Sequence, residues 1–98
     1  MYVIKTLPEF DAWLRGLKDK TAQRRLVARL RKASLGNLGD TKPVGKGVSE
    51  IREHFGPGWR MYFTLRGREL IVMLGGGDKS TQKADIATAQ RLAARIED

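Results

Sequence analysis

The sequence predicts one α+β domain: a small antiparallel sheet with two N-terminal helices packed on one face and a C-terminal helix. Apolar residues recur at helical spacing near the start and at the end of the chain. Between these regions, three β-rich segments are separated by short glycine turns. A chain of 98 residues suffices for one domain, so the expected order over residues 1–98 is β-α-α-β-β-β-α.

The N-terminal part is predicted to form a strand and then two helices. Residues 2–6, YVIKT, are β-branched and aromatic, which favours a strand. Pro8 suits the first turn of a helix. The apolar residues after it recur at i, i+3, i+4 and i+7: Phe10, Trp13, Leu14 and Leu17. A second helix is expected over residues 21–35, with Thr21 as its N-cap.

This second helix separates an apolar stripe from a basic stripe. At 100° per residue, one arc is apolar and is expected to face the core: Ala22, Leu26, Val27, Leu30 and Ala33. The opposite arc is basic: Arg24, Arg25, Arg29, Arg31 and Lys32. No acidic residue is interleaved to support the cations at i, i+4 spacing, so they repel one another. An ordinary solvated face is one interpretation, and a docking face for a phosphate backbone or an acidic protein is the favoured one.

The segment 36–47 and the three segments after it are predicted to form a loop and a sheet. Residues 36–47 are glycine-rich and lack Walker spacing, so a surface loop is expected, whose Lys42 and Lys46 help to bind a polyanion. Strands are expected over 48–55, 59–66 and 69–77, joined as antiparallel hairpins, with the last of them central because it is apolar on both faces. A final helix follows, capped by Ser80 or Thr81.

Composition narrows the functional classes. The net charge is +8, and residues 1–47 hold eleven Lys or Arg against four Asp or Glu. Such a basic region favours a polyanion or an acidic protein as partner. The chain has no cysteine, no apolar run long enough to span a membrane and no signal-peptide pattern, which together predict a soluble cytoplasmic protein.

The stretch EIREHFGPGWR, residues 50–60, places two arginines on either side of a glycine-proline-glycine turn. If the helices cover only one face of the sheet, the open face presents Arg52, Arg60 and Tyr62, with Glu50 and His54 nearby. An arginine pair beside a tyrosine suits phosphate and stacked bases. Glu50 is expected to form a cross-strand ion pair with Arg52, whereas Arg60 is expected to be functional.

Two stretches identify a family resemblance. EIREHFGPGWRMYF, followed by LIVMLGGGDKSTQKADIATAQ, resembles the HigB-like branch of the RelE toxin superfamily, whose members are often called addiction-module killer proteins. The resemblance covers nearly the whole chain. It implies a compact β-α-α-β-β-β-α fold, ribosome-dependent cleavage of mRNA, and neutralisation by a cognate antitoxin, which is expected to be acidic and of helix-turn-helix type and to form a hetero-oligomer with the toxin.

The resemblance also implies a chemistry without metal or other cofactor. The ribose 2′-hydroxyl is the nucleophile, and the site must supply a base, an acid and cations that stabilise the phosphorane. Arg60 matches the sheet arginine of the family and is the first candidate for that stabilisation, with Arg52 second. Lys79 is expected to act on the leaving group or to bind phosphate. His54 is a candidate base, and Asp78 is a candidate for the turn cap or for chemistry.

The general acid and base stay open, because some members carry histidine near the C-terminus whereas this chain has no histidine or aromatic residue after Phe63. Two alternatives to an enzyme also stay open. One is a non-catalytic basic module that binds RNA or DNA, and the other is a module that only docks an antitoxin. The candidate binding residues for RNA, ribosome or antitoxin are the same in each case: Arg24, Arg25, Arg29, Arg31, Lys32, Lys42, Lys46 and Tyr62.

Overall fold

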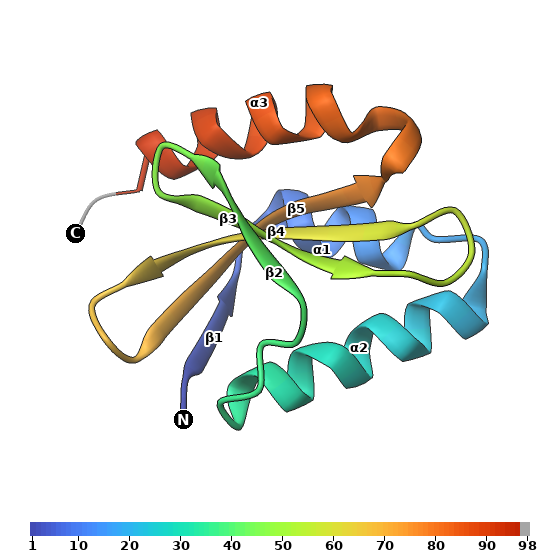
Figure 1. Ribbon diagram of the computed structural model, residues 1–98, viewed down its shortest axis with the longest axis horizontal. Helices are drawn as coiled ribbons and strands as arrows, with labels where there is room; N and C mark the ends of the chain where they lie inside the picture. Colours follow the sequence, from blue (N-terminus) through green and yellow to red (C-terminus); the bar gives the residue numbers. More distant parts are fainter. Residues whose placement is uncertain (97–98) are drawn as a thin grey trace.

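The structure, a computed structural model, describes residues 1–96 and confirms the α+β class (Figure 1). The order of elements follows the prediction with one strand added. In chain order they are β1 (Val3–Thr6), α1 (Pro8–Arg15), α2 (Lys20–Ser34), β2 (Thr41–Gly45), β3 (Val48–Glu53), β4 (Trp59–Arg66), β5 (Leu70–Asp78), a 3₁₀ turn (Lys79–Thr81) and α3 (Gln82–Ala94).

The strands form one mixed sheet in the order β1-β5-β4-β3-β2. β4 pairs antiparallel with β3 and with β5, and β5 is internal, as the hairpins predicted. The prediction of a purely antiparallel sheet was wrong in one respect, because β1 runs parallel to β5. The interpretation of 36–47 as a loop was also wrong in part, since residues 41–45 form the edge strand β2. Pro43 and Gly45 both disfavour a strand, so the sequence pattern does not indicate β2, which forms through its pairing with β3.

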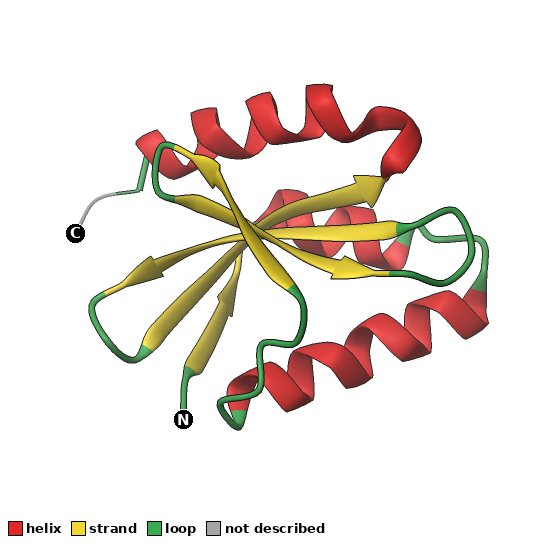
Figure 2. Ribbon diagram, in the orientation of Figure 1, coloured by secondary structure: helices red, strands yellow, loops and turns green. Residues whose placement is uncertain are grey.

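Helices cover both faces of the sheet, and Figure 2 shows them on either side of the strands. On the face of α1 and α2, the buried core consists of Phe10, Leu17, Leu26, Ile51, Met61, Phe63, Ile71 and Met73. On the face of α3, it consists of Val48, Tyr62, Val72, Leu74, Ala89, Leu92 and Ala93. The expectation of one open sheet face was therefore wrong. Without α3, Val72 and Leu74 would be exposed on the second face of the sheet, and the apolar side of α3 buries them.

The helix starts differ from the predicted caps. Asp19, not Thr21, caps α2, because its Oδ1 accepts a hydrogen bond from the amide of Ala22 (3.0 Å). Before α3, Asp78 caps the 3₁₀ turn by accepting a hydrogen bond from the amide of Ser80 (2.8 Å). Thr81 does occupy the N-cap position of α3, but its hydroxyl donates to Asp85 Oδ2 (2.5 Å). Aspartates therefore begin both of these elements.

Candidate functional site

The three cations predicted to carry the chemistry come from neighbouring elements at one end of the sheet. Arg52 near the end of β3 lies directly opposite Arg60 near the start of β4. Arg60 in turn lies opposite Gly77 near the end of β5, and Lys79 follows two residues later. We call this region the sheet-end site and define it by Arg52, Arg60 and Lys79.

Arg60 is buried at the base of this site. Its Nε lies 3.5 Å from Glu50 Oε2, and its Nη1 donates a hydrogen bond to the carbonyl of Trp59 (3.0 Å). Only 5% of the Arg60 side chain and 1% of the Glu50 side chain are exposed. Gln82, the first residue of α3, donates from Nε2 to Glu50 Oε1 (2.9 Å). The predictions that Arg60 is exposed and that Glu50 pairs with Arg52 were wrong, because α3 covers this face and Arg60 is the cation beside Glu50.

Tyr62 is also buried, with no exposed surface. It belongs to the core under α3, and its hydroxyl has no hydrogen-bond partner among the described residues. Burial, with a further contribution from the Glu50 carboxylate, raises the pKa of the Tyr62 hydroxyl. The prediction that Tyr62 lies on an open face of the sheet was wrong, since its ring packs inside the protein under α3.

Lys79 lies across the glycine turn above Arg60. A side-chain carbon built on Gly58 would lie 2.8 Å from Lys79 Cδ and 3.7 Å from Arg60 Nη1. Gly58 also has a φ of +82°, which favours glycine, so the turn admits the lysine stem at this point. Asp78 is fixed beside it, because hydrogen bonds from Ser80 hold the pKa of the Asp78 carboxyl below its usual range. Asp78 therefore has the capping role.

Asp40 joins Arg52 and His54 into a cluster on the surface. Arg52 Nη2 donates to Asp40 Oδ1 (2.9 Å), and His54 Nε2 donates to Asp40 Oδ2 (2.6 Å). The amide of Arg52 also donates to the carbonyl of Asp40 (2.8 Å). The bonds from Arg52 and His54 lower the pKa of the Asp40 carboxyl, and the bond to Asp40 raises the pKa of Arg52. Because 66% of the His54 side chain is exposed, its ring can meet a substrate.

Sequence reasoning missed Asp40, and the register of β2 explains why. Thr41 lies opposite Ile51, which brings the preceding residue, Asp40, beside Arg52. An interpretation of 36–47 as a loop contains no such register. The available signal for an edge strand beginning beside Asp40 was its position directly before the β-branched residue Thr41.

The predicted basic stripe lies on the outside of α2, but two of its cations are used within the fold. Arg24, Arg25, Arg31 and Lys32 are exposed. The guanidinium of Arg25 stacks over the Phe55 ring at 3.7 Å, and Arg29 donates to the carbonyl of Asn37. The outer edge of the sheet adds exposed Lys42 on β2 and Lys46 in the turn after it. Val27, predicted to face the core, is instead 41% exposed.

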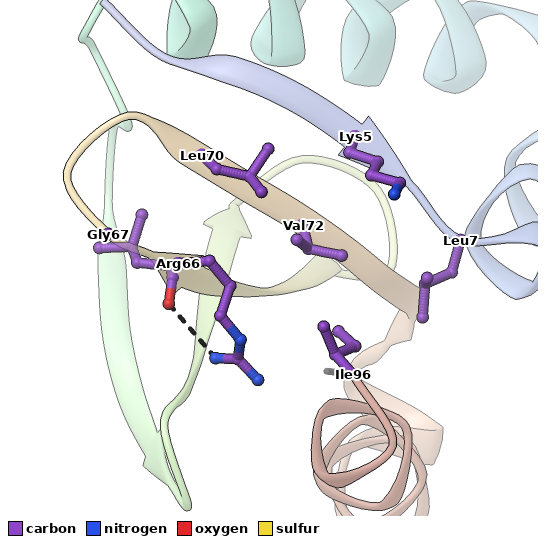
Figure 3. A pocket seen from close by; sticks show the side chains of 8 residues that line it. Lys5, Leu7, Arg66, Gly67, Leu70, Val72 and Ile96 are labelled. Carbon is purple, nitrogen blue, oxygen red and sulfur yellow. Dashed lines mark hydrogen bonds between the residues drawn. The ribbon is translucent and has the colours of Figure 1, made fainter. Parts of the chain in front are cut away.

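One hollow lies away from the sheet-end site (Figure 3). It has a volume of about 500 Å³, and its apolar lining consists of Leu7, which follows β1, Leu70 and Val72 of β5, and Ile96, which follows α3. Lys5 and Arg66 lie at its rim, and Arg66 donates to Thr64 Oγ1 (2.8 Å) and to the carbonyl of Ala93 (3.1 Å). None of the predicted site residues lines this hollow.

Two further features of the described residues concern the requirements of a metal site and of a membrane-spanning helix. Within residues 1–96, His, Asp and Glu side chains do not come together in any group of three that could bind a metal ion. The described helices also lack the combination of length and apolar composition that crossing a bilayer requires.

Fold and site together define a small basic α+β protein whose cations gather on one helix and at one end of a five-stranded sheet. The chain belongs to the family described as phage-derived Gp49-like proteins (DUF891), whose family model matches residues 12–97. It is also similar to an uncharacterized protein of Haemophilus influenzae, with 42% identity over 93 residues, which cover 95% of this chain and 94% of the relative.

Proposed function

We propose that this protein is the toxin of a type II toxin–antitoxin pair, a ribosome-dependent endoribonuclease that cleaves mRNA and thereby inhibits translation. The observation that carries the proposal is the convergence of Arg52, Arg60 and Lys79 from three neighbouring elements at one end of the sheet. The resemblance to HigB-like toxins and membership of a phage-derived family support it. A cognate antitoxin, the ribosome and mRNA are the proposed partners.

The proposed chemistry assigns each group a task. Attack of the 2′-hydroxyl on the adjacent phosphorus forms a phosphorane, and departure of the 5′-oxygen leaves a cyclic phosphate. Arg60 contacts two phosphoryl oxygens through its planar guanidinium, and Lys79 stabilises the leaving oxygen. His54, held by Asp40, takes the proton of the nucleophile. Arg52 adds positive charge beside the attacked phosphate.

Access to Arg60 is a necessary part of the proposal. Its side chain is 5% exposed, and the stem of Lys79 lies over the adjacent Gly58. The Lys79 side chain is exposed, whereas Gln82 of α3 bonds to Glu50 beside Arg60, so the proposal requires Lys79 and the start of α3 to move before the guanidinium meets a phosphate. Glu50 stays behind Arg60 and holds it in place.

One observation favours a second candidate function, a non-catalytic module that binds RNA or docks an antitoxin. The buried ion pair of Arg60 and Glu50 is also the arrangement expected of a structural arginine. Under this alternative the exposed cations of α2 carry the binding. Removal of any one of these cations would then weaken the affinity for RNA or antitoxin by a small step, and no single removal would abolish binding.

The test is primer extension on a defined message with purified ribosomes, for wild type, Arg60→Lys and Lys79→Ala. Cleavage by the wild type is expected, with a loss of roughly a hundredfold to a thousandfold in Lys79→Ala, which removes a charged contact to the transition state. A smaller loss is expected in Arg60→Lys, which keeps the charge but cannot contact two phosphoryl oxygens at once. The control is Arg91→Ala, an exposed cation on the outside of α3. Absence of cleavage by the wild type would contradict the enzyme and favour the binding module.

A further inference from the structure

The outer face of α2 combines positive charge with apolar surface. We define the α2 outer face by Arg24, Arg25, Val27, Ala28, Arg31 and Lys32, all of which are exposed. Two pairs of cations, Arg24 with Arg31 and Arg25 with Lys32, are each seven residues apart, which is two helical turns or about 10 Å. At 100° per residue, Ala28 lies between the two rows of cations and Val27 lies beside the first row.

Shallow hollows flank this ridge on both sides. One of about 300 Å³ is lined by Gln23, Arg24, Val27, Ala28 and Arg31. The other, of about 340 Å³, lies between α2 and the end of β3 and is lined by Arg25, Ala28, Arg29, Lys32, Glu53 and Phe55. The small side chain of Ala28 belongs to both hollows, so another chain can approach the helix closely along this line.

The charge of the face is not balanced within the helix. α2 contains no acidic residue, and the carboxylate of Asp19 caps only its N-terminal end, away from the cations of the outer face. Glu53 is the one carboxylate that lines either hollow. An acidic partner along this face would relieve repulsion among the cations as well as pair with them.

The apolar part of the face distinguishes a protein from RNA. Val27 is 41% exposed between arginines, and its methyl groups offer contact to apolar side chains but not to a phosphate backbone. Single-stranded RNA is bound by stacking on aromatic rings. The aromatic ring of this region, Phe55, is already covered by the guanidinium of Arg25 at 3.7 Å. Both observations favour side chains of a protein over bases.

We infer that the α2 outer face docks an acidic amphipathic helix, with small apolar residues over Val27 and Ala28 and carboxylates at seven-residue spacing over the two rows of cations. The identity of this partner as the antitoxin rests on the proposed function, whereas the docking chemistry does not. The seven-residue spacing of the cations is the reason for a helix, because a helical partner can present carboxylates at the same seven-residue spacing along α2.

The test measures binding of designed probes to the full chain by fluorescence anisotropy. The probes are an acidic peptide of three heptads with alanine and leucine on one face and glutamate on the other, a scrambled peptide of the same composition, and a single-stranded oligoribonucleotide. The amphipathic peptide is expected to bind at least about tenfold more tightly than the scrambled one. Equal or tighter binding of the scrambled peptide or of the RNA would overturn the inference.

Variants then locate the site. Arg24→Glu with Arg31→Glu is expected to weaken peptide binding by about tenfold or more and to reduce its dependence on salt. Val27→Ser is expected to weaken binding by a few fold at any salt concentration, because it removes apolar contact. The matched control, Arg91→Glu with Arg95→Glu, makes the same change of charge on the exposed side of α3. An equal loss in the control would mean attraction by net charge alone, and the inference would be wrong.

The assay also separates this inference from the proposed function. Peptide binding needs neither ribosomes nor cleavage, and circular dichroism verifies that each variant is folded. If the wild type binds the peptide but cleaves no mRNA, the docking inference stands and the proposed enzyme function is wrong. If it cleaves mRNA but does not bind the peptide selectively, the proposed function stands and the docking inference is wrong.

Discussion

At the scale of single residues, Arg60 has a structural as well as a chemical role. It lies in a buried pair with Glu50, and Gln82 satisfies the second oxygen of that carboxylate. Arg60→Ala is therefore expected to lower the free energy of unfolding by about 3–5 kcal/mol, because it leaves a buried carboxylate without its cation. Urea unfolding measures this loss, and the double variant Glu50→Gln with Arg60→Met should recover part of it.

The matching control is Arg52→Ala, which breaks an ion pair on the surface. Its effect on stability should be much smaller, since water solvates Asp40 once the arginine is gone. If Arg60→Ala and Arg52→Ala lowered the free energy of unfolding equally, burial of the Arg60–Glu50 pair would not contribute to its effect. For this reason Arg60→Lys, which retains a cation, is the better variant for tests of activity.

The cluster around Asp40 predicts a dependence of stability on acid. Its pKa in the folded protein is lowered by Arg52 and His54, so the unfolded chain binds a proton more readily. The stabilising effect of the Asp40 carboxylate is present above its unfolded pKa of about 4 and is lost as the pH falls through the lower folded value. Asp40→Asn should lose less stability than the wild type between pH 6 and pH 3, as measured by thermal unfolding. Parallel profiles would contradict a stabilising role of this carboxylate.

At the scale of elements, Gly76 near the end of β5 allows Trp13 of α1 to pack on the sheet. A side-chain carbon on Gly76 would lie 2.4 Å from the Trp13 ring, whereas one on Gly75 would have nothing within 4 Å. Trp13 is held on its other side by Trp59, with ring centroids 6.3 Å apart. Gly76→Ala should therefore cost about 1–3 kcal/mol through overpacking and change tryptophan fluorescence. Gly75→Ala, the control, should be neutral or slightly stabilising.

The elements also decide which cations of α2 are available. Arg29 donates to the carbonyl of Asn37 and its guanidinium lies against Gly39, so it holds the chain that leaves the helix. Reversal of its charge would disturb the fold as well as any docking. Among the described residues, Arg24 and Arg31 make no such tertiary hydrogen bond or ion pair, and Arg24 reaches only Thr21 within its own helix. They are the proper positions for tests of binding.

At the scale of the whole molecule, the cations of the sheet-end site do not line an enclosed pocket, because Arg60 is buried beside Glu50 while Arg52 and Lys79 lie nearer the surface. None of the hollows described above is lined by Arg52, Arg60 or Lys79. A site of this kind supplies charge but does little to align the 2′-hydroxyl with the phosphate, and alignment contributes much of the acceleration in such reactions. We expect cleavage of ribosome-bound message and little or none of the same RNA free in solution, as measured by primer extension. Equal rates on free and bound RNA would contradict a role for the ribosome in ordering the substrate.

The sequence by itself determined the class of the fold, the hairpins of β3, β4 and β5, and the basic face of α2. These features depend on local periodicity and on glycine turns, which are written in neighbouring residues. The same local patterns brought Arg52, Arg60 and Lys79 to one end of the sheet, because hairpin register fixes which residues lie opposite one another.

The tertiary structure alone decided how those residues are surrounded. Alternation placed Arg60 and Tyr62 on one face of β4, but only the packing of α3 over that face buries them. The same holds for Asp40, which meets Arg52 and His54 only because β2 pairs with β3, and for Val27, which is 41% exposed. Burial and long-range pairing depend on which elements meet, and a pattern within one element carries no information about its neighbours.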